Sequence, residues 1–201
     1  MAHLPSPLTR LIETLAELPS IGPRQATRLA FHLASLGQNA IRGLSEQIRG
    51  LEQVKVCTEC FFVHANAGMR CDICTNPARN RGVIAVIEKE TDLLSLERAK
   101  HFSGTYLILG DMPKNGALEA SQKLRIATLI ARAQKEFGGK IDEVVLALNP
   151  TSNGDFHASL LAKELGSYAK KISRLGKGLP SGGEIEFADN ETLGSALERR
   201  D

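Results

Sequence analysis

The stretch GVIAVIEK at residues 82–89 decides the fold class of this chain. After the glycine, apolar and mostly β-branched side chains follow one another without a polar residue, which is typical of a strand covered on both faces. Residues 106–109 and 144–148 repeat this pattern. Between and after these stretches, the apolar spacing favours helices at roughly 91–100, 118–137 and 156–165. Strands that alternate with helices predict an α/β domain with a largely parallel sheet.

Upstream of the first strand lie all four cysteines, Cys57, Cys60, Cys71 and Cys74. Each Cys-x-x-Cys pair can chelate one ion, and two pairs complete a tetrahedral sulfur shell with no open position. The spacing therefore predicts one structural zinc ion per chain. A redox dithiol and an iron–sulfur cluster are the alternatives, although their spacings and sequence contexts differ. His64 lies between the pairs, and we expect it to be a loop residue because four thiolates already fill the shell.

The composition is that of an ordinary globular protein, with 201 residues of which 42% are hydrophobic, enough to bury a core. The first residues lack a basic segment followed by an apolar one, and no apolar run exceeds five residues. We therefore expect a cytoplasmic protein with no membrane partner. A reducing compartment disfavours disulfides, which supports metal binding by the cysteines. The net charge of +2 is too small to indicate a nucleic-acid partner by itself.

The N-terminal part shows helical periodicity over residues 8–51, which predicts three amphipathic helices. Its first break, around Gly22, is short and is followed by a proline suited to a helix start. The segment LPSIGPRQATRLA at residues 18–30 is similar to a helix-hairpin-helix, in which turn amides face a DNA phosphate. Arg24 and Arg28, one helical turn apart, would add positive charge toward the DNA backbone. The alternative is a plain helical hairpin with two solvated arginines.

Glu88 stands where the first strand ends, the usual position of functional groups in open α/β sheets. A carboxylate there could hold Mg²⁺, but metal-dependent phosphoryl or nucleotidyl transfer needs several oxygen ligands. Asp111 and Asp155 follow later strands without an Asp-x-Asp unit, and the strand at 144–148 ends in Asn149. The residues argue against catalysis by an acidic cluster, and they leave open a Mg²⁺ or partner site at Glu88 and Asp155.

A basic run near the C-terminus has two interpretations, a path for DNA and a solvated helix face, and the run alone does not separate them. Its members are Lys163, Lys170, Lys171, Arg174 and Lys177. The glycine-rich loop that follows, residues 176–183, lacks the spacing of a nucleotide-binding P-loop, so the sequence does not indicate an ATP site.

In this order, these features resemble the RecR family of bacterial recombination mediators over nearly the whole chain. The resemblance rests on LPSIGPRQATRLAFHL at 18–33, the cysteines, Asn-Pro-Thr at 149–151 and RLGKGLPSGGEIEFADNETLGSAL at 174–197. It implies four parts: a helix-hairpin-helix DNA-binding region over 1–53, a C4 zinc finger over 54–80, a Toprim domain over 81–175, and a C-terminal segment with a Walker-B-like motif and a closing helix over 176–201.

The resemblance further implies a non-enzymatic clamp and adaptor in recombinational DNA repair. Such a protein forms ring-like dimers or tetramers on single- and double-stranded DNA, and it acts with RecO and RecF to load recombinase at single-strand gaps. Acidic Toprim residues are implicated in RecO contact, which makes Glu88 and Asp155 candidate partner residues. The alternatives are a Mg²⁺-dependent Toprim nuclease or nucleotidyl-transferase and a purely protein-binding zinc adaptor.

Three positions depart from the family's pattern. Ser20 stands where the hairpin usually has its first glycine, Lys89 replaces the usual acid after Glu88, and Asn153 takes a position usually held by Glu. The partner-binding face is therefore expected to differ from that of typical members. Because the cysteines lie between the hairpin and the α/β domain, we also expect the zinc module to brace one against the other.

Overall fold

The computed structural model describes residues 4–113 and 116–198, and it divides into two compact units, Met1–Val54 and Lys55–Asp201. We call them the hairpin unit and the α/β unit. The elements of the hairpin unit are the helices α1 (Ser6–Ala16), α2 (Pro23–Ser35) and α3 (Gln38–Gly50) and the 3₁₀ helix η1 (Leu51–Gln53). The helices predicted from the apolar spacing of residues 8–51 are therefore confirmed.

Helices α1 and α2 pack against each other across a short turn. The small side chains of Ala26 and Ala30 on α2 are fully buried, which lets the two helices approach closely. In the turn, Ser20 adopts a φ of 65°, in the left-handed region that glycine tolerates best. Ser20 thus takes a conformation that glycine would adopt at lower cost, and the turn forms with a serine in this position.

The α/β unit begins with a small module that carries the cysteines. Its elements are the antiparallel strands β1 (Lys55–Val56) and β2 (Val63–His64) and the one-turn helix α4 (Asp72–Thr75). We call residues 55–79 the cysteine module. His64 lies on β2 instead of in a loop, and it is the buried residue of that strand.

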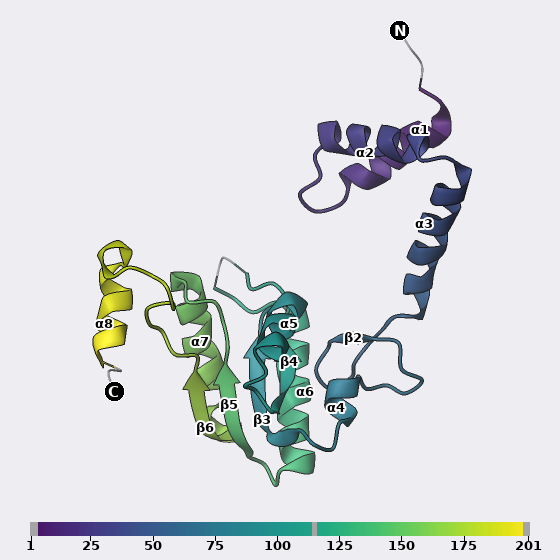
Figure 1. Ribbon diagram of the computed structural model, residues 1–201. Coiled ribbons are helices and arrows are strands. Elements are labelled where there is room, and N and C mark those ends of the chain that lie inside the picture. Colours follow the sequence, from purple (N-terminus) through teal and green to yellow (C-terminus); the bar gives the residue numbers. More distant parts are fainter. Residues whose placement is uncertain (1–3, 114–115, 199–201) are drawn as a thin grey trace. The chain divides into compact units, whose positions relative to one another are not determined.

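The rest of the unit is a four-stranded parallel sheet with the order β4-β3-β5-β6 (Figure 1). Its strands are β3 (Asn80–Ile87), β4 (Gly104–Ile108), β5 (Ile141–Leu146) and β6 (Ala169–Arg174). The connecting helices are α5 (Glu90–Ala99), α6 (Ala120–Glu136) and α7 (Ser152–Leu165), with η2 (Gly166–Tyr168) before β6. The 3₁₀ helix η3 (Ile185–Phe187) and helix α8 (Asn190–Glu198) follow the sheet. The predicted α/β fold with a parallel sheet is confirmed.

Helix α7 begins four residues before the helix expected at 156–165, because the Thr151 hydroxyl accepts a hydrogen bond from the Gly154 amide and caps the earlier start. The last residues of the expected closing helix, Arg199 and Arg200, lie outside the described residues. None of the helices in the described part of the chain combines the length and the apolar character that crossing a membrane requires.

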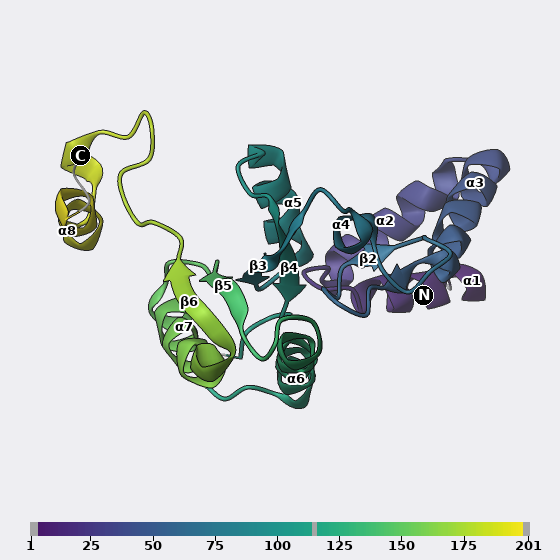
Figure 2. The same cartoon turned by 90° about the horizontal axis from the view of Figure 1, so that it is seen from below.

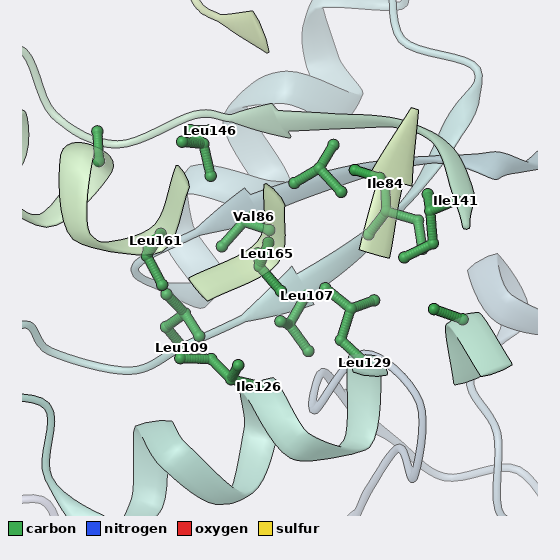
Figure 3. Packing of buried hydrophobic residues seen from close by; sticks show 14 of the residues in the cluster. Ile84, Val86, Leu107, Leu109, Ile126, Leu129, Ile141, Leu146, Leu161 and Leu165 are labelled. Carbon is green, nitrogen blue, oxygen red and sulfur yellow. The ribbon is translucent and has the colours of Figure 1, made fainter. Parts of the chain in front are cut away.

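Alternate residues of the strands point to opposite faces of the sheet, and the two faces have different covers. Ile84 and Val86 of β3 point to the face covered by α6 and α7. There they pack with Leu129 of α6 and Leu161 of α7, as Figure 3 shows. Figure 2 shows α6 and α7 on one side of the strands and α5 on the other.

The second face carries Ala85 and Ile87 of β3 and pairs them with Leu93 of α5. All four cysteines belong to this second cluster and are themselves buried. The cysteine module therefore packs on the sheet together with α5, and its burial forms part of the core of the α/β unit.

Candidate metal centre and nucleic-acid interface

The four cysteines form one buried cluster. Their exposed fractions are between 0% and 2%, and their sulfur atoms all lie within 4.8 Å of one another. The closest pair, the Sγ atoms of Cys60 and Cys71, is 3.4 Å apart, and all four cysteines are free thiols. Four sulfurs around zinc at the usual bond length lie about 3.8 Å from one another. The cluster therefore has the donor type, the number of donors and the spacing of a closed Cys₄ zinc site.

The local backbone aims these sulfurs inward. The amide of Cys57 donates to the carbonyl of Phe62, and the amide of Phe62 donates to the sulfur of Cys60 at 3.4 Å. Hydrogen bonds from the thiol of Cys60, and then from Cys71 and Cys74, lower the pKa of Cys57. Contacts with the neighbouring sulfurs, and then burial, raise the pKa of Cys60 and Cys74, so a bound cation is needed to hold all four sulfurs as thiolates.

His64 does not belong to the sulfur cluster. Its Nδ1 accepts a hydrogen bond of 3.2 Å from the amide of Asn66, and its Nε2 has no hydrogen-bond partner. The ring thus orders the loop between the two cysteine pairs, and the four thiolates remain the candidate ligands.

Glu59, inside the first Cys-x-x-Cys pair, ties the cysteine module to the sheet and to α6. Its carboxylate lies 3.1 Å from Arg70, 3.3 Å from Arg81 of β3 and 3.7 Å from Arg132 of α6. The side chains of Glu59 and Arg132 are only 12% and 7% exposed, so this pair is largely shielded from water. The sequence did not predict a role for Glu59, because the three arginines that contact it are 11 to 73 residues away in the sequence.

A second attachment lies at the edge strand β4. The amide of Ile108 donates to the carbonyl of Cys60 at 2.9 Å, and the Arg125 guanidinium lies 4.9 Å from the centre of the Phe61 ring. The turn that contains Cys57 and Cys60 therefore provides a hydrogen-bond acceptor for one backbone amide at the outer edge of β4. These contacts brace the cysteine module against the sheet, while a brace toward the hairpin region stays a prediction.

In the hairpin unit, Gly22 is the N-cap of α2, and Pro23 is the first helical residue. No side chain caps this end, so the amides of Arg24 and Gln25 belong to the first turn that a helix leaves unpaired. A Cβ added at Gly22 would meet no atom within 4 Å, so the backbone here is open to a close approach. An uncapped helix start of this kind attracts anions.

Arg24 and Arg28 are exposed on α2, and neither forms an ion pair with any residue in the described ranges. Both guanidinium groups lie on the helix that starts at Gly22. The amide donors and the two exposed cations therefore lie on the same helix start, and their contact with a phosphate backbone stays a prediction.

The acidic residues at the strand ends lie apart from one another and are engaged separately. Glu88 accepts hydrogen bonds from the backbone amide of Asn149 at 3.4 Å and from its side-chain amide at 3.2 Å. Asp111 lies 3.1 Å from the ammonium of Lys89. Asp155, in the first turn of α7, pairs with Arg174 and, at 3.0 Å, with Lys177.

Four of the five cations in the basic run of the C-terminal part are paired with acids as well. Lys170 lies 2.7 Å from Asp142, and Lys171 lies 2.9 Å from Glu143 across the β5–β6 ladder. Lys177 contacts Glu191 of α8 in addition to Asp155. The expected helix face is wrong, because Lys170, Lys171 and Arg174 lie on the strand β6, and the contacts with acids argue against a path for DNA. A pocket of about 310 Å³ lies beside Arg174 and Lys177, but acids line it too.

Three family models match successive parts of the chain. The family model described as "RecR, helix-hairpin-helix" matches residues 8–50, "Toprim domain" matches 82–176, and "RecR, C-terminal" matches 178–200. The chain is similar to the recombination protein RecR of Roseiflexus castenholzii, with 38% identity over 98% of this chain and 94% of the relative.

Two further relatives carry the same name. The recombination protein RecR of Synechococcus sp. (strain RCC307) is 42% identical over 96% of this chain and 88% of its own length. That of Chloroflexus aurantiacus is 38% identical over 97% of this chain and 94% of its own length. With the buried cysteine cluster between the first two of the three matched parts, these similarities show that the chain belongs to the RecR family of recombination proteins.

Proposed function

We propose that this chain is a non-enzymatic DNA clamp and adaptor in recombinational repair, which works with RecO and RecF to load recombinase at single-strand gaps. The observation that carries the proposal is the open start of α2, where uncapped amides adjoin the exposed Arg24 and Arg28. Contacts of this kind reach the phosphates and ignore the bases, which suits a protein that must act on any gap, in single- or double-stranded DNA.

In this proposal the cysteine module holds one structural Zn²⁺ through Cys57, Cys60, Cys71 and Cys74. When bound, the ion would lock two short knuckles that have almost no regular structure of their own. The module would then be held in place on the α/β unit by two contacts. Glu59 pairs with Arg132 of α6, and the carbonyl of Cys60 accepts a hydrogen bond from Ile108 of β4. The zinc thus stabilises the sheet that carries the surface for partners.

The surface of the hairpin unit supports assembly with further copies of the chain. Helix α3 buries none of its residues within the unit, and its apolar face remains open. Leu44 is 37% exposed and Ile48 is 59% exposed. An apolar stripe on an amphipathic helix is expected to be covered in the working protein, which supports a ring-like dimer or tetramer around DNA.

A salt titration of DNA binding tests the assignment. Arg24→Glu/Arg28→Glu is expected to weaken binding at every salt concentration and to reduce the slope of log K against log salt by about 2, one unit for each lost phosphate contact. Lys135→Glu/Lys140→Glu makes the same charge change on exposed residues of the α/β unit and should leave the slope unchanged. Equal effects of the two pairs would refute the assigned contact.

The same titration separates the alternatives. With Mg²⁺ present, cleavage products that disappear in Glu88→Gln would establish a nuclease, and an absence of binding at low salt would establish a purely protein-binding adaptor. Light scattering with and without DNA tests the ring: the native chain should run as an oligomer, and Leu44→Glu/Ile48→Glu should dissociate it without unfolding it.

A further inference from the structure

The sheet edge formed by the carboxyl ends of the strands, which we call the carboxyl edge, leads to a conclusion beyond the proposed function. In an open α/β sheet, this edge is where ligands and metal ions bind. Glu88 follows β3, Asp111 follows β4, and Asp155 begins the helix after β5. Carboxylates in these places are the donors that a Mg²⁺ ion prefers, so the fold itself raises the question of a divalent cation.

The geometry does not fit such an ion. Within residues 4–113 and 116–198, the only group of three or more metal-ligating side chains that come together is the cysteine cluster. Glu88, Asp111 and Asp155 therefore do not converge on one point. Mg²⁺ requires near-ideal octahedral coordination and gives up its water reluctantly, so carboxylates held by separate partners inside the protein do not bind it.

Instead, three side-chain cations of the chain itself lie at this edge. The Lys89 ammonium is 3.1 Å from Asp111, and the Lys177 ammonium is 3.0 Å from Asp155. Arg174 contacts Asp155 from the end of β6. The contact with Asp111 raises the pKa of Lys89, and the contacts with Arg174 and then Lys177 lower the pKa of Asp155, so Lys89 stays protonated and Asp155 stays ionised at neutral pH.

We propose that Lys89, Arg174 and Lys177 take the place of a divalent cation at the carboxyl edge and close it to Mg²⁺. Exposed ion pairs of this kind are individually weak and can open. When such a pair opens, however, the Lys or Arg side chain stays attached to the chain beside the carboxylate, and its positive charge still repels an approaching metal ion. At a separation of about 5 Å in a water-like dielectric, one such charge lowers the affinity for a divalent ion about tenfold.

The carboxylates then serve as structural acceptors. Glu88 ties the end of β3 to the turn after β5 through Asn149. Asp155 ties α7 to β6 through Arg174, and Lys177 extends the connection to Glu191 of α8. Each tie joins different elements of the carboxyl edge, so the edge keeps its shape without an ion.

The test measures metal binding by the full-length, zinc-loaded protein. Mg²⁺ is titrated by calorimetry, and Mn²⁺ is titrated by electron paramagnetic resonance. The native chain is expected to show no saturable site for either ion beyond the zinc. Lys89→Gln/Arg174→Gln/Lys177→Gln is expected to gain a saturable site at least about tenfold tighter than any residual binding, and adding Glu88→Gln or Asp155→Asn should remove it.

A matched control removes three exposed lysines near the opposite edge of the sheet. Lys135, Lys140 and Lys163 lie at the end of α6, just before β5 and near the end of α7; changing all three to Gln should not create a site. Circular dichroism and the thermal midpoint verify that the variants are folded. Saturable Mg²⁺ binding by the native chain that Asp155→Asn abolishes would overturn the proposal, and so would a folded triple variant that still binds no divalent ion. Neither result bears on the DNA contacts of the hairpin unit.

Discussion

The hairpin unit and the α/β unit contain similar kinds of side chain but use them in opposite ways. In the hairpin unit, Arg24 and Arg28 are exposed, and no ion pair joins them to another described residue. In the α/β unit, Lys170, Lys171 and Arg174 each contact an acid. A cation that already has an internal partner has less to gain from a phosphate. The comparison teaches that a count of basic residues does not locate a DNA surface, whereas their pairing does.

Apolar side chains follow the same division. The α/β unit buries two clusters, one on each face of its sheet, while α3 of the hairpin unit buries no residue. The α/β unit is therefore expected to be stable by itself, whereas the stability of the hairpin unit depends on what covers α3. Four substitutions test this contrast in stability and pairing.

The largest effect is expected at the cysteine cluster, because it is buried within the core of the α/β unit. Cys71→Ser should lose zinc and destabilise this unit by about 5 kcal/mol or more, since folding of such modules is coupled to metal binding. Denaturant unfolding together with zinc analysis measures the effect. His64→Gln should retain one zinc per chain. If a metal-free variant had an unchanged free energy of unfolding, the cysteine module would not contribute to the stability of the α/β unit. The contrast between the two units would then be weaker.

The next largest effect concerns Glu59. Glu59→Ala leaves Arg132, with a side chain only 7% exposed, without its nearest carboxylate, and breaking a shielded pair in this way should cost about 3 kcal/mol. Glu136, whose side chain is 31% exposed, provides the comparison, and Glu136→Ala should cost clearly less. Urea unfolding of both variants ranks them. Equal costs would mean that burial does not set the strength of this network.

The sequence predicted those parts of the fold whose signal is local. The run at 82–87 indicated a buried strand, and β3 is the second strand of a sheet covered on both faces. Strand β6 was missed because its sequence, AKKISR, has only two apolar residues among polar and charged ones, as an edge strand can. The spacing of the cysteines predicted their cluster because four ligands in two short pairs constrain the geometry on their own.

Contacts between distant residues could not be predicted in this way. Glu143 meets Lys171 only because β5 and β6 pair in parallel in one particular register. The sequence showed a basic run with few acids nearby, but the acids that oppose it come from another strand. The same applies to Glu59, whose partners lie on β3 and α6. The candidate DNA contacts at Gly22, Arg24 and Arg28 remain predictions that the geometry supports.

A smaller effect of opposite sign is expected in the hairpin turn. Ser20 has a φ of 65°, a conformation that costs an L-residue about 1 kcal/mol and glycine very little. Ser20→Gly should therefore stabilise the hairpin unit by about 0.5–1 kcal/mol, measured as a rise in its thermal midpoint. Ser35→Gly, at the end of α2, should have the reverse effect, because glycine disfavours helix. A loss of stability in Ser20→Gly would show that the serine hydroxyl has a role in the turn.

The smallest effect is expected at Asp155, because its ion pairs are exposed to solvent. Arg174 and then Lys177 hold the pKa of Asp155 below its ordinary value of 3.8. The pairs therefore stabilise the fold above that value and are lost as the pH falls through the lowered pKa of the folded state. The rate of pepsin cleavage within residues 175–189 should rise only below pH 3.8. In Asp155→Asn, the cleavage rate should show no such rise at this pH. Faster cleavage that begins above pH 3.8 would show that Arg174 and Lys177 do not hold Asp155 in its charged form. The contrast between paired and unpaired cations would then depend only on Lys170 and Lys171, which pair with acids of β5.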